Sequence, residues 1–240
     1  WTTDVGTVDG LGLFTAQTSI GSGFVSAVNG SVAGIASITV IAGPLDHIIV
    51  TPNPATMGVG QTLLFAAIGY DIYNNQIIGL GFSWTTDAGM IANGLLTAQT
   101  TPGSGTVTAT SGSVSSSAAV TILIGPITQI IVTPNPLTIA VGGSQQFLAV
   151  ACDTYGNPIP GVTFDWTITI GTMDFFNVFY ALTTPGTGMA TASNGTIVGV
   201  AIITVVHGPI DHITITPDPV SIMVGSAQQF TAQAYDQYNN

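Results

Sequence analysis

The chain has 240 residues and a formal net charge of −11, because it contains eleven Asp residues and no Glu, Lys or Arg. Charged residues make up 5% of the sequence, whereas they make up about 25% of an ordinary domain. The lack of cations excludes nucleic-acid binding, which needs them to neutralise phosphates, and the short apolar runs exclude a membrane-spanning helix of roughly 20 apolar residues.

The sequence repeats with a period of about 83 residues, and such a repeat has to be recognised before any shorter pattern is interpreted. Three tryptophans are spaced 83 and 82 residues apart, and three Gly-Pro steps are spaced 82 and 83 residues apart. These positions are Trp1, Trp84 and Trp166, and Gly43-Pro44, Gly125-Pro126 and Gly208-Pro209.

This repeat divides the chain into four pieces. Residues 43–124 and 125–207 are two whole units. Residues 1–42 correspond to the back portion of a unit, and residues 208–240 correspond to the front portion of another. Together the two end pieces lack only the counterpart of Gln76–Ser83. We therefore expect each end piece to be completed by the other end of a neighbouring copy.

The first piece, residues 1–42, alternates apolar and polar residues in the manner of half-buried strands. Its candidate core residues are Trp1, Phe14 and the alternating run Ile35–Ile41. The piece contains only the later strands of a unit, so we expect these side chains to form an incomplete core.

The first whole unit, residues 43–124, is predicted to form about seven short strands that are separated by turns rich in Gly, Pro and Asn. This pattern indicates an antiparallel β-sandwich of immunoglobulin-like type. Phe65 and Trp84 are expected in its core. The strand ranges that can be assigned are Leu45–Thr51, Gln61–Tyr70, Ile77–Thr86, Leu95–Thr100, Gly105–Thr110 and Ser116–Ile124.

The second whole unit, residues 125–207, repeats this pattern. Phe147, Ala149 and Ala151 fall on one face of a strand, and Trp166 is expected in the core. The unit departs from the others at GTMDFFNVFYALTTPG, residues 171–186, where they have Gly-Leu followed by Leu or Phe and then Thr-Ala. The role of this stretch stays open.

The last piece, residues 208–240, is predicted to contain only the first two strands of a sandwich. Phe230, Ala232 and Ala234 form an apolar face that no residue of the piece can cover. Chains of fewer than about 40 residues rarely fold unaided. We therefore expect this face to pack against residues 1–42 of another copy.

These residues resemble a known family. The segment LDHIIVTPNPATMGVGQTLLFAAIGYDIYNNQI, followed by FSWTTDAGMI and GLLTAQTTPGSGTVTATSG, is similar to the bacterial and archaeal immunoglobulin-like repeats of the Big group. The resemblance extends over the whole chain. It implies an all-β fold of tandem immunoglobulin-like β-sandwich domains and an extracellular structural role at the cell surface. It implies no catalytic residues.

Two N-glycosylation sequons occupy the same hairpin position in two units. Asn29-Gly30-Ser31 and Asn194-Gly195-Thr196 both match the pattern N-x-S/T. Asn-Gly is also favourable turn chemistry, because both residues tolerate a positive φ. Glycans would protect sheet edges that this chain cannot protect with lysine. We expect glycosylation at Asn29 or Asn194, with a plain turn as the alternative.

An Asp recurs before each turn that contains Tyr and Asn, at Asp71, Asp153 and Asp236. The carboxylate could bind calcium, which needs six or more oxygen ligands. It could also accept backbone N–H groups in an Asx-type turn. We favour the Asx-type turn.

Two of the three junctions carry an Asp-His pair, Asp46-His47 or Asp211-His212, whereas the third has Thr128-Gln129. A metal site at the junctions would need the same ligands at all three. We therefore expect these pairs to form hydrogen bonds at the junctions, and we expect no metal or cofactor.

No other group of residues predicts chemistry. Three histidines without a cysteine partner do not match a zinc site. The glycine-rich turns have no lysine that would make a phosphate loop. The single Cys152 stands where other units have Tyr, so we expect a packed free thiol. The chain is not expected to be an enzyme.

The incomplete end pieces favour a structural subunit of an extracellular filament or pilus-like fibre. Copies of the chain would form a head-to-tail homopolymer by strand complementation, or the repeats would continue in one polypeptide. Head-to-tail contacts generate an open fibre. The residues expected in the core between copies are Trp1, Phe14, Ile35, Phe230, Ala232 and Ala234.

The alternative is that these units are stalk modules of a large cell-surface adhesin or S-layer-like protein. A third class, a sugar-binding module, would need clustered exposed aromatic residues. The one cluster consists of Phe175, Phe176, Phe179 and Tyr180, which could equally be core residues or a subunit contact. The favoured function and its alternative both place the chain outside the cell.

Overall fold

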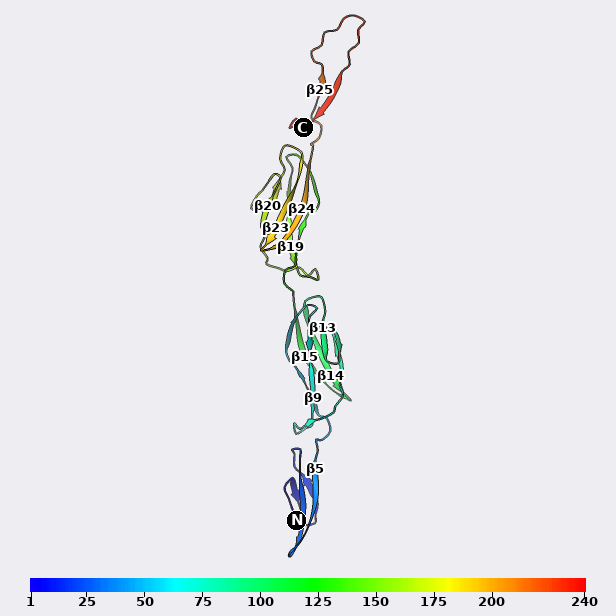
Figure 1. The fold of residues 1–240 in the computed structure, drawn as a ribbon, viewed down its shortest axis with the longest axis vertical. Helices are drawn as coiled ribbons and strands as arrows, with labels where there is room; N and C mark the ends of the chain where they lie inside the picture. The colour runs from blue at the N-terminus through cyan, green and yellow to red at the C-terminus, as the bar shows by residue number, and fades with distance from the viewer. The chain divides into compact units, whose positions relative to one another are not determined.

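The computed structural model describes residues 1–240 and contains only β-strands and their connections (Figure 1). The chain divides into two compact units, Trp1–Ile124 and Gly125–Asn240. Each unit contains one complete sandwich and one partial domain. The prediction of an all-β fold with tandem immunoglobulin-like sandwiches is confirmed. With no helix in the structure, nothing helical could cross a membrane.

The complete domain of the first unit has three sheets, with strand orders β10-β9-β6, β11-β14-β15-β7 and β12-β13-β8. All pairs are antiparallel except β15 with β7. Its strands are β6 (His47–Thr51), β7 (Ala55–Gly58), β8 (Thr62–Leu64), β9 (Ala66–Tyr70), β10 (Gln76–Ile77), β11 (Ser83–Thr86), β12 (Gly89–Ala92), β13 (Leu95–Ala98), β14 (Gly103–Ser111) and β15 (Val114–Leu123). The long strands β14 and β15 pair along their whole length (Figure 1).

Two of the predicted strands are each divided in two. The range Gln61–Tyr70 is β8 and β9, because the chain passes at Phe65 from a sheet with β13 to a sheet with β6. The amide of Phe65 donates instead to the carbonyl oxygen of Gly94, at 2.8 Å. The range Ile77–Thr86 is likewise divided, since β10 pairs with β9 and β11 pairs with β14.

The complete domain of the second unit has the same plan, with sheets β16-β19, β17-β24-β23-β20 and β18-β22-β21. Its strands are β16 (Gln129–Thr133), β17 (Leu137–Ala140), β18 (Ser144–Gln146), β19 (Leu148–Cys152), β20 (Asp165–Ile168), β21 (Thr172–Met173), β22 (Val178–Tyr180), β23 (Gly186–Asn194) and β24 (Ile197–Val206). Phe147 and Ala151 are buried and Leu148 is exposed, so the predicted strand face is confirmed. Cys152 is the expected buried free thiol.

The divergent stretch 171–186 keeps the hairpin of the other units. Asn177, with φ of 61°, stands where Gly94 has φ of 82°. Phe179 is fully buried, as is its counterpart Leu96. The amide of Phe147 donates to the Asn177 carbonyl oxygen at 2.9 Å. The stretch therefore supplies a core residue in the usual place.

The partial domains each hold a different half of a sandwich. Residues 1–42 form sheets β1-β4-β5 and β2-β3, and residues 208–240 form only the hairpin β25-β26, which Figure 1 shows without a second sheet beside it. The strands are β1 (Thr2–Thr3), β2 (Gly6–Val8), β3 (Phe14–Ala16), β4 (Gly21–Asn29), β5 (Val32–Val40), β25 (His212–Thr216) and β26 (Thr231–Tyr235).

Candidate functional site

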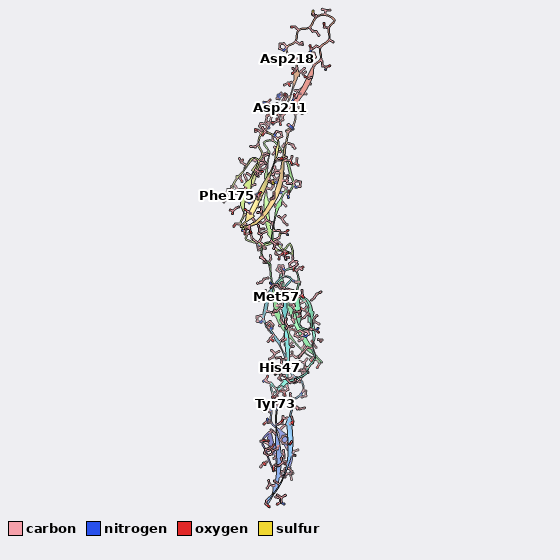
Figure 2. The ribbon with its side chains drawn as sticks, in the orientation of Figure 1. His47, Met57, Tyr73, Phe175, Asp211 and Asp218 are labelled. Carbon is pink, nitrogen blue, oxygen red and sulfur yellow. The ribbon has the colours of Figure 1, made fainter.

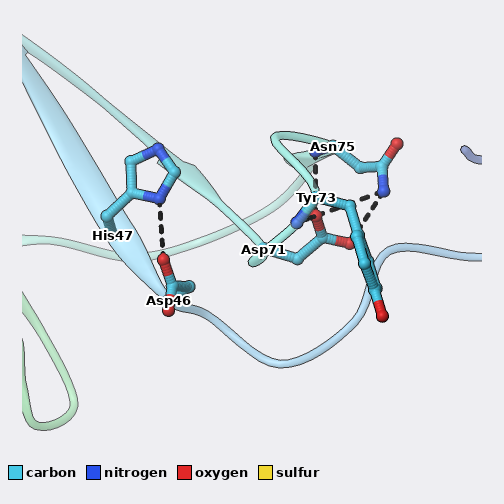
Figure 3. A network of polar contacts seen from close by, with 5 residues as sticks. All are labelled: Asp46, His47, Asp71, Tyr73 and Asn75. Carbon is cyan, nitrogen blue, oxygen red and sulfur yellow. Dashed lines mark hydrogen bonds and ion pairs between the residues drawn. The ribbon is translucent and has the colours of Figure 1, made fainter. Parts of the chain in front are cut away.

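The best-defined polar site is a hydrogen-bonded turn that recurs three times along the chain. Figure 3 shows the first copy. The Asp71 side chain, 1% exposed, accepts the amides of Tyr73 and Asn75 at 2.9 Å each on Oδ1. Its Oδ2 accepts the amide of Gly43 at 2.8 Å, and the Asn75 Nδ2 donates to both carboxylate oxygens. The predicted Asx-type turn is confirmed.

The other two copies of the turn have the same hydrogen bonds. Asp153 accepts bonds from Gly125, Tyr155 and Asn157, and Asp236 accepts bonds from Gly208, Tyr238 and Asn240. Each carboxylate oxygen already accepts N–H groups, so its lone pairs are not directed at a cation. The structure has no group of three or more His, Cys, Asp and Glu side chains that could hold a metal ion.

These hydrogen bonds determine the charge state of the turn. Burial of the Asp71 carboxylate opposes ionisation, but the hydrogen bonds from the Asn75 side chain and from the amides of Gly43, Asn75 and Tyr73 outweigh it and lower the pKa to about 2. The pKa of Asp236 is lowered to about 2 by the equivalent bonds against the same effect of burial. The turns therefore keep a negative charge at any physiological pH.

The Asn of the turn also bonds to the preceding domain of the same unit. The Asn75 Nδ2 donates to the Thr18 carbonyl oxygen at 2.8 Å, and its Oδ1 accepts the amide of Ile20 at 3.3 Å. In the second unit, the Asn240 Nδ2 donates to the Thr183 carbonyl oxygen at 2.6 Å. This role was not predicted from the sequence, although each Asp is followed four residues later by an Asn.

The Asp-His pairs are arranged differently from the prediction of junction hydrogen bonds. In Figure 3 the His47 Nδ1 faces the Asp46 Oδ2, at 3.0 Å, so the pair bonds to itself. The His47 ring stacks on Tyr70, its cross-strand neighbour, with ring centroids 5.4 Å apart. The same pair and stack recur at Asp211, His212 and Tyr235. The third junction has Gln129 opposite Cys152, so both members of the stack are replaced together.

Three aromatic rings form the centre of the complete sandwich in the second unit. The Phe147 ring lies 6.3 Å from that of Trp166 and 6.3 Å from that of Phe179, measured between centroids. Phe147 and Phe179 are both fully buried. Trp84 and Trp166 pack on the cores of their domains, as expected, but are only half-buried. Both tryptophans lie on edge strands, β11 and β20.

The counterparts of these rings in the partial domains are uncovered. Phe230, which corresponds to Phe147, is 45% exposed, and Trp1, which corresponds to Trp166, is 56% exposed. Phe14, the counterpart of Phe179, is half-buried, and Ala232 and Ala234 are exposed. Both partial domains therefore present an apolar inner face to solvent.

Segments whose partner strands are absent from 208–240 do not become strands. Residues 220–223 correspond to β7 and β17, which pair with the long hairpins of their domains. Residues 227–229 correspond to β8 and β18, which pair with β13 and β22. Neither segment has strand structure in the last piece. In the complete domains the corresponding strands form beside partner strands that residues 208–240 lack.

The side chain of Ile35 lies outside the row that faces the core. Ile35 pairs with Ser26, and its counterpart in the complete domain, Ser117, is exposed on the outer face and pairs with Thr108. Ala36, next along β5, has the core-facing orientation, since its counterpart Ala118 is fully buried. Because strand side chains alternate, the shift of one residue moves Ile35 to the outer face.

The sequons lie at the ends of the long hairpins. Gly30 and Gly195, with φ of 61° and 59°, occupy the first central position of each two-residue turn, as in type II′ turns. The Asn precedes the turn and does not adopt a positive φ, which corrects the turn argument. Asn29 is exposed, whereas Asn194 is half-buried and its Nδ2 donates to the Thr163 carbonyl oxygen at 3.0 Å.

The aromatic cluster of the divergent stretch divides between core and surface. Phe179 belongs to the core, while Phe175 and Phe176 are 93% and 71% exposed, and Figure 2 shows Phe175 projecting away from its domain. Asp174 holds the turn by accepting the amides of Phe176 and Val178, both at 2.9 Å. The exposed aromatic surface thus consists of the Phe175 and Phe176 rings, whose centroids lie 5.8 Å apart with the rings nearly perpendicular, together with Tyr180, which is 45% exposed.

A known protein is similar to part of this chain. No family model matches the chain. The Ice-binding protein 1 of Shewanella frigidimarina is 31% identical over 150 residues, which cover 60% of this chain and 17% of that protein's length.

Solved structures with similar folds include surface proteins of bacteria. The Escherichia coli adhesin FdeC is 20% identical, with 84% of this chain and 77% of that one covered and a TM-score of 0.45. The S-layer protein SbsC is 20% identical, with 100% and 38% covered and a TM-score of 0.34. InvD of Yersinia pseudotuberculosis is 18% identical, with 81% and 71% covered and a TM-score of 0.38. These similarities concern the fold alone.

Proposed function

We propose that the chain is a structural segment of an extracellular array, in which immunoglobulin-like sandwiches of the Big type follow one another head-to-tail. In this array the half-domain 208–240 of one copy and the half-domain 1–42 of the next combine into one sandwich. The observation that carries the proposal is that the two halves expose complementary parts of one core. The role is structural and includes no catalytic step.

The aromatic residues of the two halves are complementary. Phe147, Trp166 and Phe179 are in contact within one domain, and their counterparts are Phe230, Trp1 and Phe14. Combining the halves in the same geometry would place Phe230 between Trp1 and Phe14. Burial of large apolar side chains of this kind stabilises an interface by about 1.5–3 kcal/mol for each residue.

The strand edges of the two halves are complementary as well. By analogy with β7 and β15, residues 220–223 would pair in parallel with β5. By analogy with β8 and β13, residues 227–229 would pair with β3. Backbone groups that are left without partners in each half would then be satisfied, which is the usual energetic basis of strand complementation.

Each copy would contribute one half at each end, so the contact is heterologous and generates an open fibre. If the repeats continue within one polypeptide, the same contacts form inside a single chain. The alternative function, stalk modules of an adhesin or S-layer-like protein, uses the same sandwiches. Both functions place the chain outside the cell, where the predicted glycans would be exposed to solvent.

Deletion of residues 209–240 tests the proposal. Electron microscopy and sedimentation should show polymers of the whole chain and none of the truncated chain. The two complete domains should keep their circular dichroism, because their cores contain no residue of the deleted segment. The melting temperature of the domain 125–207 should fall only slightly, since the deletion removes the bond from the Asn240 Nδ2 to the Thr183 carbonyl oxygen. Filaments formed by the truncated chain would rule the proposal out.

A matched pair of substitutions separates the inner face from general damage. Phe230→Asp places a charge on the inner face of the last piece and should abolish polymerisation. Thr231→Asp adds the same charge one residue later, on the outer face, and should leave polymerisation intact.

The intact mass of native material distinguishes separate chains of 24.3 kDa from a continuous repeat polypeptide.

A further inference from the structure

One side chain in each complete domain bonds to the edge of a long hairpin as a strand would. The Nδ2 of Asn135 donates to the Val200 carbonyl oxygen at 3.0 Å, and its Oδ1 accepts the amide of Ile202 at 3.0 Å. The side-chain amide thus acts as donor and acceptor to two backbone groups that point out of the sheet.

The first unit contains the same contact. The Nδ2 of Asn53 donates to the Ser117 carbonyl oxygen at 3.4 Å, and its Oδ1 accepts the amide of Ala119 at 3.1 Å. In both domains the Asn lies in a Thr-Pro-Asn-Pro segment just after the first strand. The contact is therefore a repeated part of the domain.

The last piece has an Asp at this position. Its segment reads Thr-Pro-Asp-Pro, and Figure 2 shows Asp218 on the exposed segment that follows β25. In the sandwich formed by two copies, Asp218 would face the Ile35 carbonyl oxygen and the Ser37 amide, the counterparts of Val200 and Ile202. An ionised carboxylate accepts hydrogen bonds and cannot donate one.

We propose that Asp218 makes the contact between copies sensitive to pH, so that the contact forms more strongly when this side chain is protonated. This inference rests on the proposed combination of residues 208–240 with residues 1–42. The protonated carboxyl group donates its O–H to the Ile35 carbonyl oxygen and accepts the Ser37 N–H on its other oxygen. The ionised form keeps the second bond but turns a negative oxygen toward the Ile35 carbonyl oxygen.

The other titratable groups are placed elsewhere. The hairpin β4-β5 that would face Asp218 contains no titratable side chain. In the first piece, Asp4 accepts the Phe24 amide and Asp9 holds the turn at 11–13. In the last piece, the others are near the opposite end of β25 or on the C-terminal turn: Asp211, His212, Tyr235, Asp236 and Tyr238.

The sign of the effect follows from which form binds better. Protonation of Asp218 favours the assembled state, so assembly is strongest in acid and weakens as the pH rises. The Asp236 carboxylate is protonated only near pH 2, because its pKa is about 2.

The test compares the whole chain with Asp218→Asn and with Asp211→Asn. The critical concentration for assembly is measured by sedimentation between pH 4 and pH 7.5. Asp218→Asn restores the amide of the complete domains, so it should lower the critical concentration at neutral pH by about tenfold and remove the pH dependence. Asp211→Asn removes the same charge from the other end of β25 and should keep the pH dependence of the unmodified chain.

Each result decides a separate point. Equal effects of the two substitutions would assign the change to net charge and overturn the role of Asp218. Assembly that is the same for all three proteins at every pH would also overturn it, while the proposed function would stand. Failure of all three to assemble at any pH would overturn the proposed function, and this inference with it.

Discussion

The domain at 125–207 and the half-domain at 208–240 begin with nearly the same pattern but reach different structures. In the complete domain, β17 forms beside β24 and Phe147 is fully buried. In the half-domain, the counterpart of β17 is not a strand, and Phe230 is 45% exposed. Only β25 and β26 keep their pairing, because both strands lie within the half-domain. Strand formation here depends on the partner more than on the local sequence.

Alanine substitution at Phe147 and Phe230 tests this comparison with the largest expected effect. Phe147→Ala removes a fully buried ring and should lower the free energy of unfolding of its domain by about 3–5 kcal/mol. Phe230→Ala should change the unfolding of the unassembled chain by less than about 1 kcal/mol, since its ring packs on no second layer. Urea unfolding measures both, and equal losses would mean that Phe230 already has a core.

Asn75 tests the attachment between the two parts of the first unit. Asn75→Ala removes the bonds to the Thr18 carbonyl oxygen and to the Asp71 carboxylate, which should lower the free energy of unfolding by about 1–2 kcal/mol. Tyr73→Ala, in the same turn but with an exposed ring, is the control and should change it by less than about 0.5 kcal/mol. Similar losses from both would assign the effect to the turn itself.

The Asp turns predict a specific response to acid. The folded-state pKa values of Asp71 and Asp236 are about 2, whereas an unfolded Asp titrates near 3.9. Because the folded values are depressed, the stabilisation is complete above about pH 4 and is lost as the pH falls from there toward 2. Thermal melts between pH 5 and pH 2 measure the loss. Asp71→Asn should flatten the acid limb, and an unchanged limb would contradict the role of the turn.

The parts of the fold that the sequence predicted are those with a local pattern. Alternation placed Phe147, Ala149 and Ala151 on the correct face, and the Asp before each Tyr–Asn turn identified the Asx-type turn. The passage between sheets at Phe65 was not predictable, because the alternation continues through it without a break. In the run from Ile35 to Ile41, apolar residues occur on both faces, so the alternation does not show which face is buried.

Contacts between distant residues were not accessible in the same way. The bond between Asn75 and Thr18 joins residues 57 positions apart, and no local pattern specifies it. The hairpin at Asn177 and Phe179 was hidden because the preceding Phe175 and Phe176 made the stretch look unlike the other units. Comparison of corresponding positions between units, as with Asn53, Asn135 and Asp218, recovers information that one unit alone does not contain.

The smallest effect is expected at the two sequons, one in the partial domain 1–42 and the other in the complete domain 125–207. Glycan attachment requires an accessible Asn Nδ2. Asn29 is exposed, whereas Asn194 is half-buried and its Nδ2 donates to the Thr163 carbonyl oxygen. Asn29 should therefore carry the glycan more completely than Asn194 in native material, as peptide mass spectrometry can measure. Asn29→Gln should remove the added mass and change stability little, because the hairpin turn depends on Gly30. Modification of Asn194 alone would contradict this order, and an unmodified mass would leave turn geometry as the only role of both sequons.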